Sequence, residues 1–169
     1  MTKEEIRRYL SALGEVLSAQ GLSAEICLAG GASMIFLIGN RPVTKDIDAY
    51  FAPQAAVRSA AEQVARRFDL PADWLNDGVK GFFYTQPPQR LLWHAAGISV
   101  YSVEPDYLLA MKALSGRDED RRDLKALIAH LGLTSVESAL EIVTRYIPPR
   151  VLTPKVNLIL EEIFSELPP

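Results

Sequence analysis

The sequence predicts an α/β fold of the α+β type, in which a small mixed β-sheet is flanked by helices and followed by a helical C-terminal half. Two observations predict it. Short runs of β-type residues occur before residue 104, and two of them are separated only by the turn at Ala96-Gly97. From Pro105 onward, apolar residues recur at helical spacing. We therefore expect an α/β core over residues 1–104 and a helical part over residues 105–169, packed on the core as one compact unit.

The N-terminal part of the chain alternates between helical and strand patterns. Thr2 and Glu5 form a capping box that begins the first helix, and Gly21 ends that helix. Gly or Pro residues then mark the ends of a strand, a short helix, a second strand and a longer helix, which we expect over residues 25–29, 30–38, 46–51 and 53–68. These elements supply the first two strands of the sheet.

The middle of the chain predicts a loop and a hairpin. Residues 71–81 show neither helical nor strand periodicity, so we expect a loop there. Residues 90–95 and 98–103 are β-type runs that form the hairpin. The hairpin completes the sheet.

The C-terminal part predicts four helices. Pro105 suits the first position of one helix, and Gly132 is the expected end of the next. Thr134 and Glu137 form a capping box for the third helix, and the last helix begins at Pro154.

The composition bounds the class of protein. At 169 residues with 49% hydrophobic side chains, the chain is long enough for one domain with a sizeable core. Its 18 basic and 21 acidic residues give a net charge of −3, so a polynucleotide partner would have to bind a local basic patch. No apolar run reaches the roughly 18 residues of a membrane span, and the N-terminal residues do not resemble a signal peptide. We therefore expect a cytoplasmic protein without membrane contacts.

Cysteine and histidine give no sign of a metal site. Cys27 lies in an apolar run, where we expect a buried thiol, and as the only cysteine it cannot form an internal disulfide. His94 and His130 are far apart, and no Cys or His cluster has the spacing of zinc ligands. Zinc is therefore not expected.

A pair of motifs in the first half indicates a site. Gly30-Gly31 ends the first expected strand, and Asp46 and Asp48 lie on the second. Side chains alternate along a strand, so the two carboxylates share one face while Ile47 points to the other. Taken alone, each motif is also consistent with an ordinary turn or a solvated strand face. Their order, with fourteen residues between them, favours a site.

The residue types in these motifs suit a metal-bound nucleoside triphosphate. Mg²⁺ usually takes one or two protein carboxylates and completes its shell with water and phosphate. Glycine lets backbone amides approach a phosphate closely, and the helix that follows offers its positive end. We expect Asp46 and Asp48 to hold Mg²⁺, and Gly30, Gly31 and Ser33 to contact phosphate.

The order of strand, Gly-Gly turn, short helix and acidic strand resembles the signature of the nucleotidyltransferase superfamily that includes DNA polymerase beta. Its members carry an apolar residue before a Gly-Gly or Gly-Ser pair, and an acidic pair between apolar residues on the next strand. The resemblance implies a nucleotidyltransferase-like fold, a Mg²⁺ cofactor and a nucleoside triphosphate substrate. Arg41 and Thr44 extend the pattern ahead of Asp46 and would place a donor and a hydroxyl at the mouth of the strand. They are equally consistent with a loop residue and a cap at the start of the strand.

A second segment, around Lys112, resembles the C-terminal part of the AbiEii-like toxin nucleotidyltransferases and related bacterial families. These carry a lysine on a helix, then a basic residue, and an aspartate that begins the next helix. The resemblance implies that Lys112 meets the triphosphate, that Arg117 supports it, and that Asp123 is the late acidic residue, with Asp118 and Asp120 as alternatives. Taken alone, the segment is also consistent with a charged junction between two helices.

One feature of the superfamily is missing. Many active members have a third carboxylate on a later strand, where it acts as a general base or holds a second metal. The strand expected at residues 98–103 has none. Asp77, in the expected loop, is the best substitute, and we expect that loop to lie over or beside the cleft. If Asp77 lies elsewhere, Asn76 becomes a turn residue.

These observations lead to three hypotheses. The first is a Mg²⁺-dependent nucleotidyltransferase that moves a nucleoside monophosphate to an acceptor hydroxyl, with Lys112 as an electrostatic clamp. For this enzyme the AbiEii resemblance implies a toxin of a toxin–antitoxin pair, with RNA as the acceptor and a protein antitoxin as partner. The second is a catalytically silent binding module of the same fold that acts through protein contacts, which the missing carboxylate favours. The third is a structural partner protein whose acidic strand is merely solvated.

Overall fold

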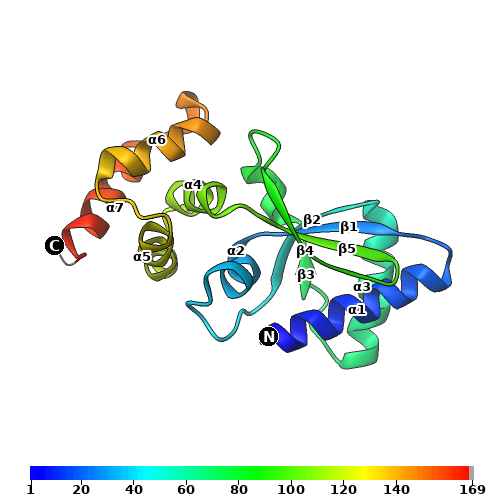
Figure 1. Ribbon diagram of the computed structural model, residues 1–169. Helices are drawn as coiled ribbons and strands as arrows, with labels where there is room; N and C mark the ends of the chain where they lie inside the picture. The colour runs from blue at the N-terminus through cyan, green and yellow to red at the C-terminus, as the bar shows by residue number, and fades with distance from the viewer. Residues whose placement is uncertain (168–169) are drawn as a thin grey trace. The chain divides into compact units, whose positions relative to one another are not determined.

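A computed structural model describes residues 1–167 of the chain (Figure 1). The chain divides into two units. The first comprises Met1–Gly81 and Gln89–Val103, and the second comprises Phe82–Pro88 and the chain from Glu104. The segment Phe82–Pro88, which we expected in the α/β core, therefore belongs to the helical unit.

The first unit contains a mixed β-sheet. Within residues 1–167 its strands are β1 (Ala24–Leu28), β2 (Ile47–Ala52), β3 (Leu75–Asn76), β4 (Gln89–Ala95) and β5 (Ile98–Val103), in the order β3-β2-β1-β5-β4. β1 is antiparallel to β2 and parallel to β5, while β2 is parallel to β3 and β4 is antiparallel to β5. The predicted α+β class with a small mixed sheet is confirmed.

Two long helices bury one face of this sheet. The helical segments before residue 83 are α1 (Lys3–Ala19), α2 (Gly30–Ser33), the π-helix η1 (Met34–Ile38), α3 (Gln54–Phe68) and the 3-10 helix η2 (Gly78–Phe82). Ile26, Ala49 and Val100, from three neighbouring strands, share one core with Leu10 of α1 and Val57 of α3 (Figure 1). The side chains that alternate with these core residues lie on the other face of the sheet.

Helix α1 begins as the sequence predicts. The Thr2 hydroxyl accepts a hydrogen bond from the Glu5 N–H at 3.2 Å, and the Glu5 carboxylate accepts one from the Thr2 N–H at 2.8 Å. The capping box is thus confirmed. Gly21, with φ of 68°, follows the end of the helix.

The segment 71–81, which we expected to be a loop, contains the edge strand β3. Trp74 is buried, and its indole N–H donates to the carbonyl of Ala61 on α3 at 3.1 Å. Leu75 is also buried and pairs with Ile47 of β2. Burial of these two apolar side chains brings the segment against the sheet. A strand of two residues is too short to show an alternating pattern in the sequence.

The second unit is helical. Within the described residues it contains α4 (Pro105–Ser115), the 3-10 helix η3 (Asp118–Asp120), α5 (Arg121–His130), α6 (Val136–Tyr146), the 3-10 helix η4 (Pro149–Val151) and α7 (Pro154–Ser165). Pro105 and Pro154 occupy the first turns of α4 and α7, as predicted. Gly132 follows α5 with φ of 64°, so the predicted end of that helix is also confirmed.

Helix α6 is capped one residue later than predicted. Ser135, not Thr134, accepts the backbone N–H of Ser138 at 3.2 Å. The Ser138 hydroxyl accepts the Ser135 N–H in return, so Ser138 takes the place that we gave to Glu137. A short hydroxyl at this position closes the box as a carboxylate would, which shifts the start of the helix by one residue.

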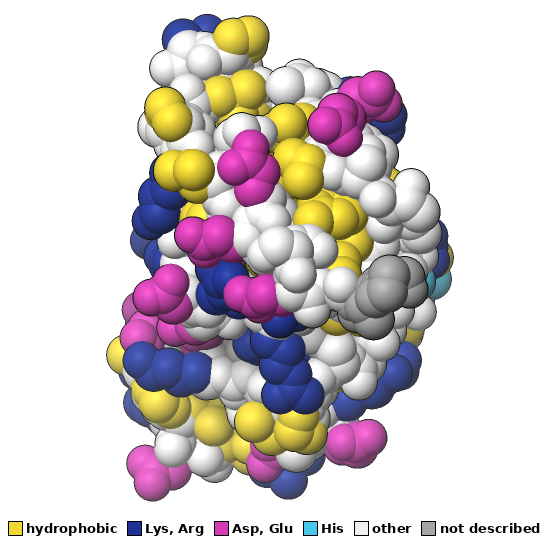
Figure 2. All heavy atoms as spheres, turned by 90° about the vertical axis from the view of Figure 1, so that its left-hand side faces the viewer, with side chains coloured by type: hydrophobic (Ala, Val, Ile, Leu, Met, Phe, Trp, Pro, Cys, Tyr) yellow, Lys and Arg dark blue, Asp and Glu magenta, His cyan; other side chains and the backbone are white. Residues whose placement is uncertain are grey.

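Charges of both signs are interspersed on the surface. On the face drawn in Figure 2, basic and acidic side chains lie among one another. Arg121 on α5 pairs with Glu162 at 2.7 Å and with Glu166 at 2.6 Å, and Lys125 also pairs with Glu166. These ion pairs connect α5 to the end of α7.

None of the helices within residues 1–167 combines the length and apolar character that a membrane span requires.

Candidate functional site

The Gly-Gly turn connects β1 to α2 and is fixed to β2. The backbone N–H of Ala29 donates to the carbonyl of Asp48 at 2.8 Å, which holds the turn against the strand that carries the acidic residue. Gly30 has φ of +53°, in the left-handed region that favours glycine. The turn therefore lies beside β2 in a conformation that glycine allows at little cost.

Gly30 lies in close contact with the side chain of Asp48. A Cβ atom at Gly30 would lie 2.5 Å from Oδ2 of Asp48 and 3.3 Å from its Cγ. Non-bonded atoms pack at about 3.5–4.0 Å, so any side chain at this position would displace the carboxylate. The backbone of the turn and the Asp48 carboxylate are therefore neighbours because residue 30 is glycine.

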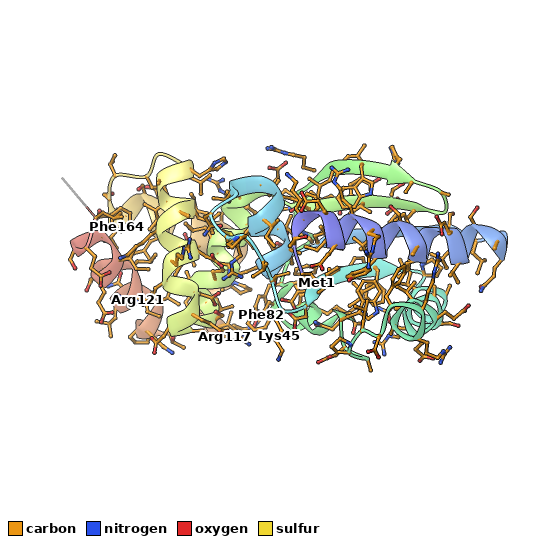
Figure 3. The ribbon with its side chains drawn as sticks, turned by 90° about the horizontal axis from the view of Figure 1, so that it is seen from below. Met1, Lys45, Phe82, Arg117, Arg121 and Phe164 are labelled. Atoms are coloured by element: carbon orange, nitrogen blue, oxygen red, sulfur yellow. The ribbon has the colours of Figure 1, made fainter. Side chains whose placement is uncertain are left out.

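Arg41 and Thr44 approach the same turn. A Cβ atom at Gly31 would lie 2.7 Å from Nη1 of Arg41 and closer still to the hydroxyl oxygen of Thr44. Thr44 is buried, and its N–H donates to the carbonyl of Met1 at 2.9 Å, while its carbonyl accepts from the Met1 ammonium at the start of α1 (Figure 3). The structure thus brings together five of the residues that the sequence singled out: Gly30, Gly31, Arg41, Thr44 and Asp48.

Asp46 and Asp48 flank a core residue. Asp48 lies in β2, and Asp46 precedes the strand by one residue. Both are partly exposed, whereas Ile47 between them is fully buried. Lys45, just ahead of Asp46, is exposed (Figure 3). This alternation is the one expected of two carboxylates on the face of the strand that points away from the core.

The donor set at this position suits Mg²⁺. Within residues 1–167, no three His, Cys, Asp or Glu side chains gather into a metal-binding group. Mg²⁺ needs only one or two protein carboxylates and completes its octahedron with water and phosphate oxygens. Asp46 and Asp48 are the residues that would hold it. Because residue 30 is glycine, the backbone of the turn can approach the Asp48 carboxylate more closely than a residue with a Cβ could.

Ser33, expected to contact phosphate, lies in the core instead. It is fully buried at the end of α2, and its hydroxyl accepts a hydrogen bond from the Ser102 hydroxyl on β5 at 2.8 Å. Ser102 is equally buried. The contacts of Ser33 therefore attach α2 to the sheet and do not support a phosphate contact by its side chain. Its short helix turns this position inward, which the Gly-Gly pattern alone could not reveal.

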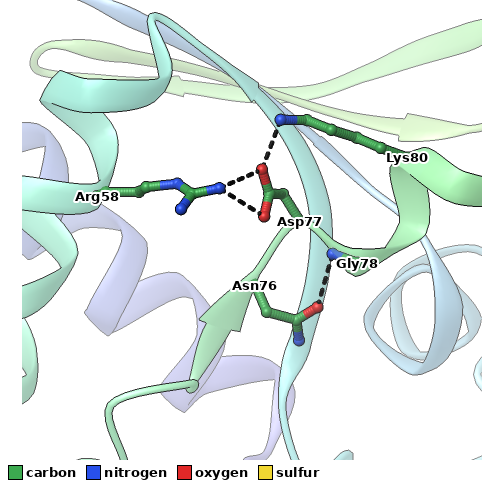
Figure 4. A network of polar contacts seen from close by, with 5 residues as sticks. All are labelled: Arg58, Asn76, Asp77, Gly78 and Lys80. Carbon is green, nitrogen blue, oxygen red and sulfur yellow. Dashed lines mark hydrogen bonds and ion pairs between the residues drawn. The ribbon is translucent and has the colours of Figure 1, made fainter.

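Asp77 is paired with two basic side chains (Figure 4). The Arg58 guanidinium on α3 donates to its two oxygens at 3.0 and 2.8 Å, and the Lys80 ammonium donates at 2.5 Å. Hydrogen bonds from Lys80 and then from Arg58 lower the pKa of the Asp77 carboxyl below its ordinary value. These contacts connect β3 and η2 to α3. They engage both oxygens of Asp77 and do not support its use as a third carboxylate of the site, which stays a prediction.

Asn76 is the residue of this segment that lies beside Asp48. In the parallel pairing of β2 with β3, Asp48 is opposite Asn76. Residues opposite each other on neighbouring strands point their side chains to the same face, so Asn76 shares the face of Asp48. From the sequence we expected Asn76 to be a turn residue if Asp77 lies away from the cleft. Its place depends on the two-residue strand β3, which left no periodic signal.

Lys112 lies in a buried ionic cluster of the second unit. Its ammonium is 2.5 Å from Oδ1 of Asp120 and 2.8 Å from Oδ2 of Asp123, and the Lys112 side chain is only 8% exposed. Asp123 is fully buried, and the hydroxyl of Ser115 donates to Oδ2 of Asp120. Lys112 and two of the predicted aspartates are therefore partners of one another. The contact of Lys112 with a triphosphate stays a prediction.

Arg117 forms no buried ion pair within the described chain. Its guanidinium lies 3.6 Å from the Glu119 carboxylate, and both side chains are largely exposed (Figure 3). Asp118 is likewise exposed, at the start of η3. Of the three candidate aspartates, Asp120 and Asp123 are therefore buried, whereas Asp118 is exposed.

A separate hollow of about 360 Å³ lies at the other end of the sheet. It is lined in part by a row of residues paired across four strands: Ala52, Glu25, Ser99 and His94. A ring nitrogen of His94 lies 3.0 Å from the Ser99 hydroxyl. Because Glu25 stands near the start of β1 and the Gly-Gly turn follows its end, the hollow is distinct from the candidate site.

Cys27 has the inert character that the sequence predicts. It is buried and free of disulfide bonds, and burial raises the pKa of its thiol to about 12. The thiol therefore stays protonated near neutral pH and is a poor nucleophile.

Comparison with known proteins gives no relative: no protein-family model, no curated protein and no solved structure matches this chain.

Proposed function

We propose that the chain binds a nucleoside triphosphate with Mg²⁺ at the Gly-Gly turn and transfers its nucleoside monophosphate to an acceptor hydroxyl. The observation that carries the proposal is the contact of Gly30 with the Asp48 carboxylate. It places backbone amides, which suit phosphate, next to a carboxylate, which suits a divalent cation. Arg41 approaches the same turn from the loop before β2 and adds a cationic donor.

Each residue has a role that follows from its chemistry. Asp46 and Asp48 hold the cation, which when bound neutralises phosphate charge. Gly30 and Gly31 let phosphate oxygens approach the backbone N–H groups of the turn. Arg41 donates to a phosphate oxygen in the planar geometry of its guanidinium. Thr44 is buried beside Gly31 and holds the loop in place through its contacts with Met1.

The reaction is a displacement at the α-phosphorus. The acceptor oxygen forms a bond to that phosphorus, the bond to the bridging oxygen of the β-phosphate breaks, and pyrophosphate leaves. The acceptor proton passes to solvent. The protein contributes mainly positioning and electrostatic stabilisation of the phosphates, as is general for transfers of this kind. The proposal rests on residues of the first unit, and the roles given to Lys112, Arg117 and Asp123 stay predictions.

Isothermal titration calorimetry tests the binding step. Wild-type protein should bind a non-hydrolysable triphosphate in the presence of Mg²⁺, and the double variant Asp46→Asn, Asp48→Asn should lose this binding. The matched control is Asp73→Asn, which removes an exposed carboxylate outside the site. Equal affinities for the wild type and the double variant would refute the metal assignment.

Incubation with labelled triphosphates and total RNA tests the transfer step. Label in RNA would identify RNA as the acceptor, in keeping with the toxin-like role that the resemblance implies. Label that appears only after a candidate protein substrate is added would identify a different acceptor.

A second candidate function is a catalytically silent module that binds a nucleotide and acts through protein contacts. The observation that favours it is the amide of Asn76 beside Asp48, at a position where a carboxylate would have added a third carboxylate to the site or a base. Metal-dependent triphosphate binding without transfer to any acceptor, for all four triphosphates, would decide for this module. A protein antitoxin would then bind independently of nucleotide turnover.

A further inference from the structure

The edge strand β3 places one polar side chain next to the acidic strand. Leu75 and Ile47 are opposite each other and are both buried toward the core. The next residues of the two strands, Asn76 and Asp48, are also opposite each other and must point to the other face, because side chains alternate. Neighbouring strands lie about 4.8 Å apart, so the two side chains are close enough to contact one ligand.

The amide of Asn76 is oriented by its own turn. Its Oδ1 accepts a hydrogen bond from the Gly78 N–H at 3.1 Å. Figure 4 shows the amide nitrogen at the end of the side chain away from Gly78, and the Asp77 carboxylate directed toward Arg58 and Lys80. The turn therefore uses the oxygen of the amide as an acceptor and leaves its nitrogen, with two N–H donors, on the other side.

We infer that Asn76 is a further binding residue of the site, whose side-chain N–H donates a hydrogen bond to a phosphate oxygen of a triphosphate held beside Asp48. This inference rests on the proposed function and deepens it. The N–H end of an amide carries partial positive charge, so it attracts an anionic oxygen and repels a metal ion. Asn76 thus provides an anion contact next to the carboxylate that holds the cation.

The inference also sets the number of metal ions. A carboxylate at position 76 would share one face with Asp46 and Asp48, and three carboxylates suit a second cation, as in two-metal sites. With an amide there, two carboxylates are left on this part of the sheet. The site then holds one divalent ion and uses a hydrogen bond where a second ion would have neutralised phosphate charge.

Two substitutions separate this role from a purely structural one. Asn76→Ala removes both the N–H donors and the acceptor for Gly78. Asn76→Asp keeps an acceptor for the Gly78 N–H, and with it the turn, but replaces the donors by a metal ligand. A residue that acts only through the turn would tolerate the second change. Gln63→Glu, an exposed amide-to-carboxylate change on α3, controls for the added charge.

Two titrations are made on each full-length variant: Mn²⁺ alone, followed by electron paramagnetic resonance, and a non-hydrolysable triphosphate with saturating Mg²⁺, followed by calorimetry. Asn76→Ala should bind the triphosphate about tenfold more weakly with unchanged Mn²⁺ affinity, because it loses a hydrogen bond to a charged group. Asn76→Asp should bind Mn²⁺ alone at least tenfold more tightly, as expected for an added hard oxygen ligand. Gln63→Glu should match the wild type in both.

The outcomes also separate this inference from the proposed function. If the wild type binds the Mg²⁺-triphosphate and Asn76→Ala binds it equally well, the inference is wrong and the proposed function stands. If Asn76→Asp has wild-type affinity for Mn²⁺, Asn76 does not share the site of the cation and the inference is likewise wrong. If the wild type binds neither Mn²⁺ nor the triphosphate, the proposed function fails and the inference fails with it.

Discussion

Gly30 and Asp48 touch so closely that a methyl group on Gly30 would lie 2.5 Å from the Asp48 carboxylate oxygen. Gly30 makes a turn, whereas Asp48 is the residue that we propose to bind a cation. Here the shape of the turn decides where the carboxylate stands, because the Ala29 N–H also fixes the backbone of Asp48. A substitution in the turn should therefore act on the cation binding that we propose for Asp48.

Gly30→Ala tests this relationship. The substitution should cost about 1–2 kcal/mol for the left-handed backbone alone, and more because the new Cβ must displace Asp48. Gly21→Ala is the matched control, since Gly21 also has positive φ but a Cβ there would meet nothing within 4 Å. Urea unfolding should show the larger loss for Gly30→Ala, and only this variant should lose Mg²⁺-triphosphate binding. Equal losses of unfolding free energy in both variants would show that the contact with Asp48 does not contribute to the cost.

The buried pair Ser33 and Ser102 gives a second prediction. Ser102→Ala leaves the Ser33 hydroxyl buried without its donor, at a cost of about 1–3 kcal/mol. Ser33→Ala should cost less, because the Ser102 hydroxyl also donates to the carbonyl of Val103 at 3.1 Å. The double variant should be less destabilised than the sum of the two single variants, because both partners are then gone. Thermal unfolding of the three variants measures this coupling. Additive losses would contradict a direct interaction between the hydroxyls.

For Ser33 the same variants address the phosphate contact. Ser33→Ala and Ser102→Ala should alter triphosphate affinity to a similar, small extent, because they break the same hydrogen bond. A large loss in Ser33→Ala alone would restore Ser33 as a phosphate ligand.

Lys112 provides a third prediction, and here burial changes the expectation that the sequence suggested. If Lys112 acted only as an electrostatic clamp on a triphosphate, replacing it would change the stability of the fold little. Lys112→Met instead leaves Asp120 and Asp123 without their cation in a buried site, which should lower the free energy of unfolding by about 3–5 kcal/mol. Lys125→Met, on the surface of α5, should cost no more than about 1 kcal/mol.

Denaturant unfolding and labelling with a triphosphate are measured on the same Lys112 variants. A Lys112→Met protein that keeps its stability and loses turnover would favour the clamp over the structural cluster.

Asp77 predicts a pH dependence. The pKa of its carboxyl in the folded chain lies below the ordinary value of 3.8, because Lys80 and Arg58 bind the ionised form. Its contribution to stability is therefore fully present above that value and is lost as the pH falls through the lower pKa of the folded chain. Asp77→Asn should remove this part of the acid sensitivity. The difference in urea midpoint between wild type and variant should shrink from pH 6 toward pH 2.

Asp73→Asn, an exposed carboxylate of the same segment, is the control for the acid titration. A wild-type advantage over Asp77→Asn that stays constant down to pH 2 would contradict the assigned ion pairs.

Most of the first half of the fold could be read from the sequence because its signals are local. The capping box of Thr2 and Glu5, the hairpin turn at Gly97 and the alternation around Ile47 each depend on neighbours in the chain. The Gly30-Gly31 turn belongs to the same class, since its conformation is set by the residues themselves.

The parts that the sequence did not show depend on partners distant in the chain. Asn76 gains its place from pairing with β2, and Ser33 is drawn inward by a hydroxyl 69 residues away. The capping box of Ser135 was off by one residue because two adjacent hydroxyls offer nearly the same local signal. Lys112 was expected to meet a triphosphate, and the sequence did not show that Asp120 and Asp123 would be its buried partners.

The shortness of β3 has a consequence for how copies of the chain meet. A sheet edge exposes unpaired N–H and C=O groups to which another chain can add a strand. β3 covers the edge of β2 beside Ile47 and Asp48, and has only two residues with which a strand of another chain could pair. At the opposite edge, β4 carries a register irregularity between Leu91 and Trp93, which twists its ladder. The two-residue strand and the irregular ladder thus leave few regular pairing positions at these two places for the strand of another chain.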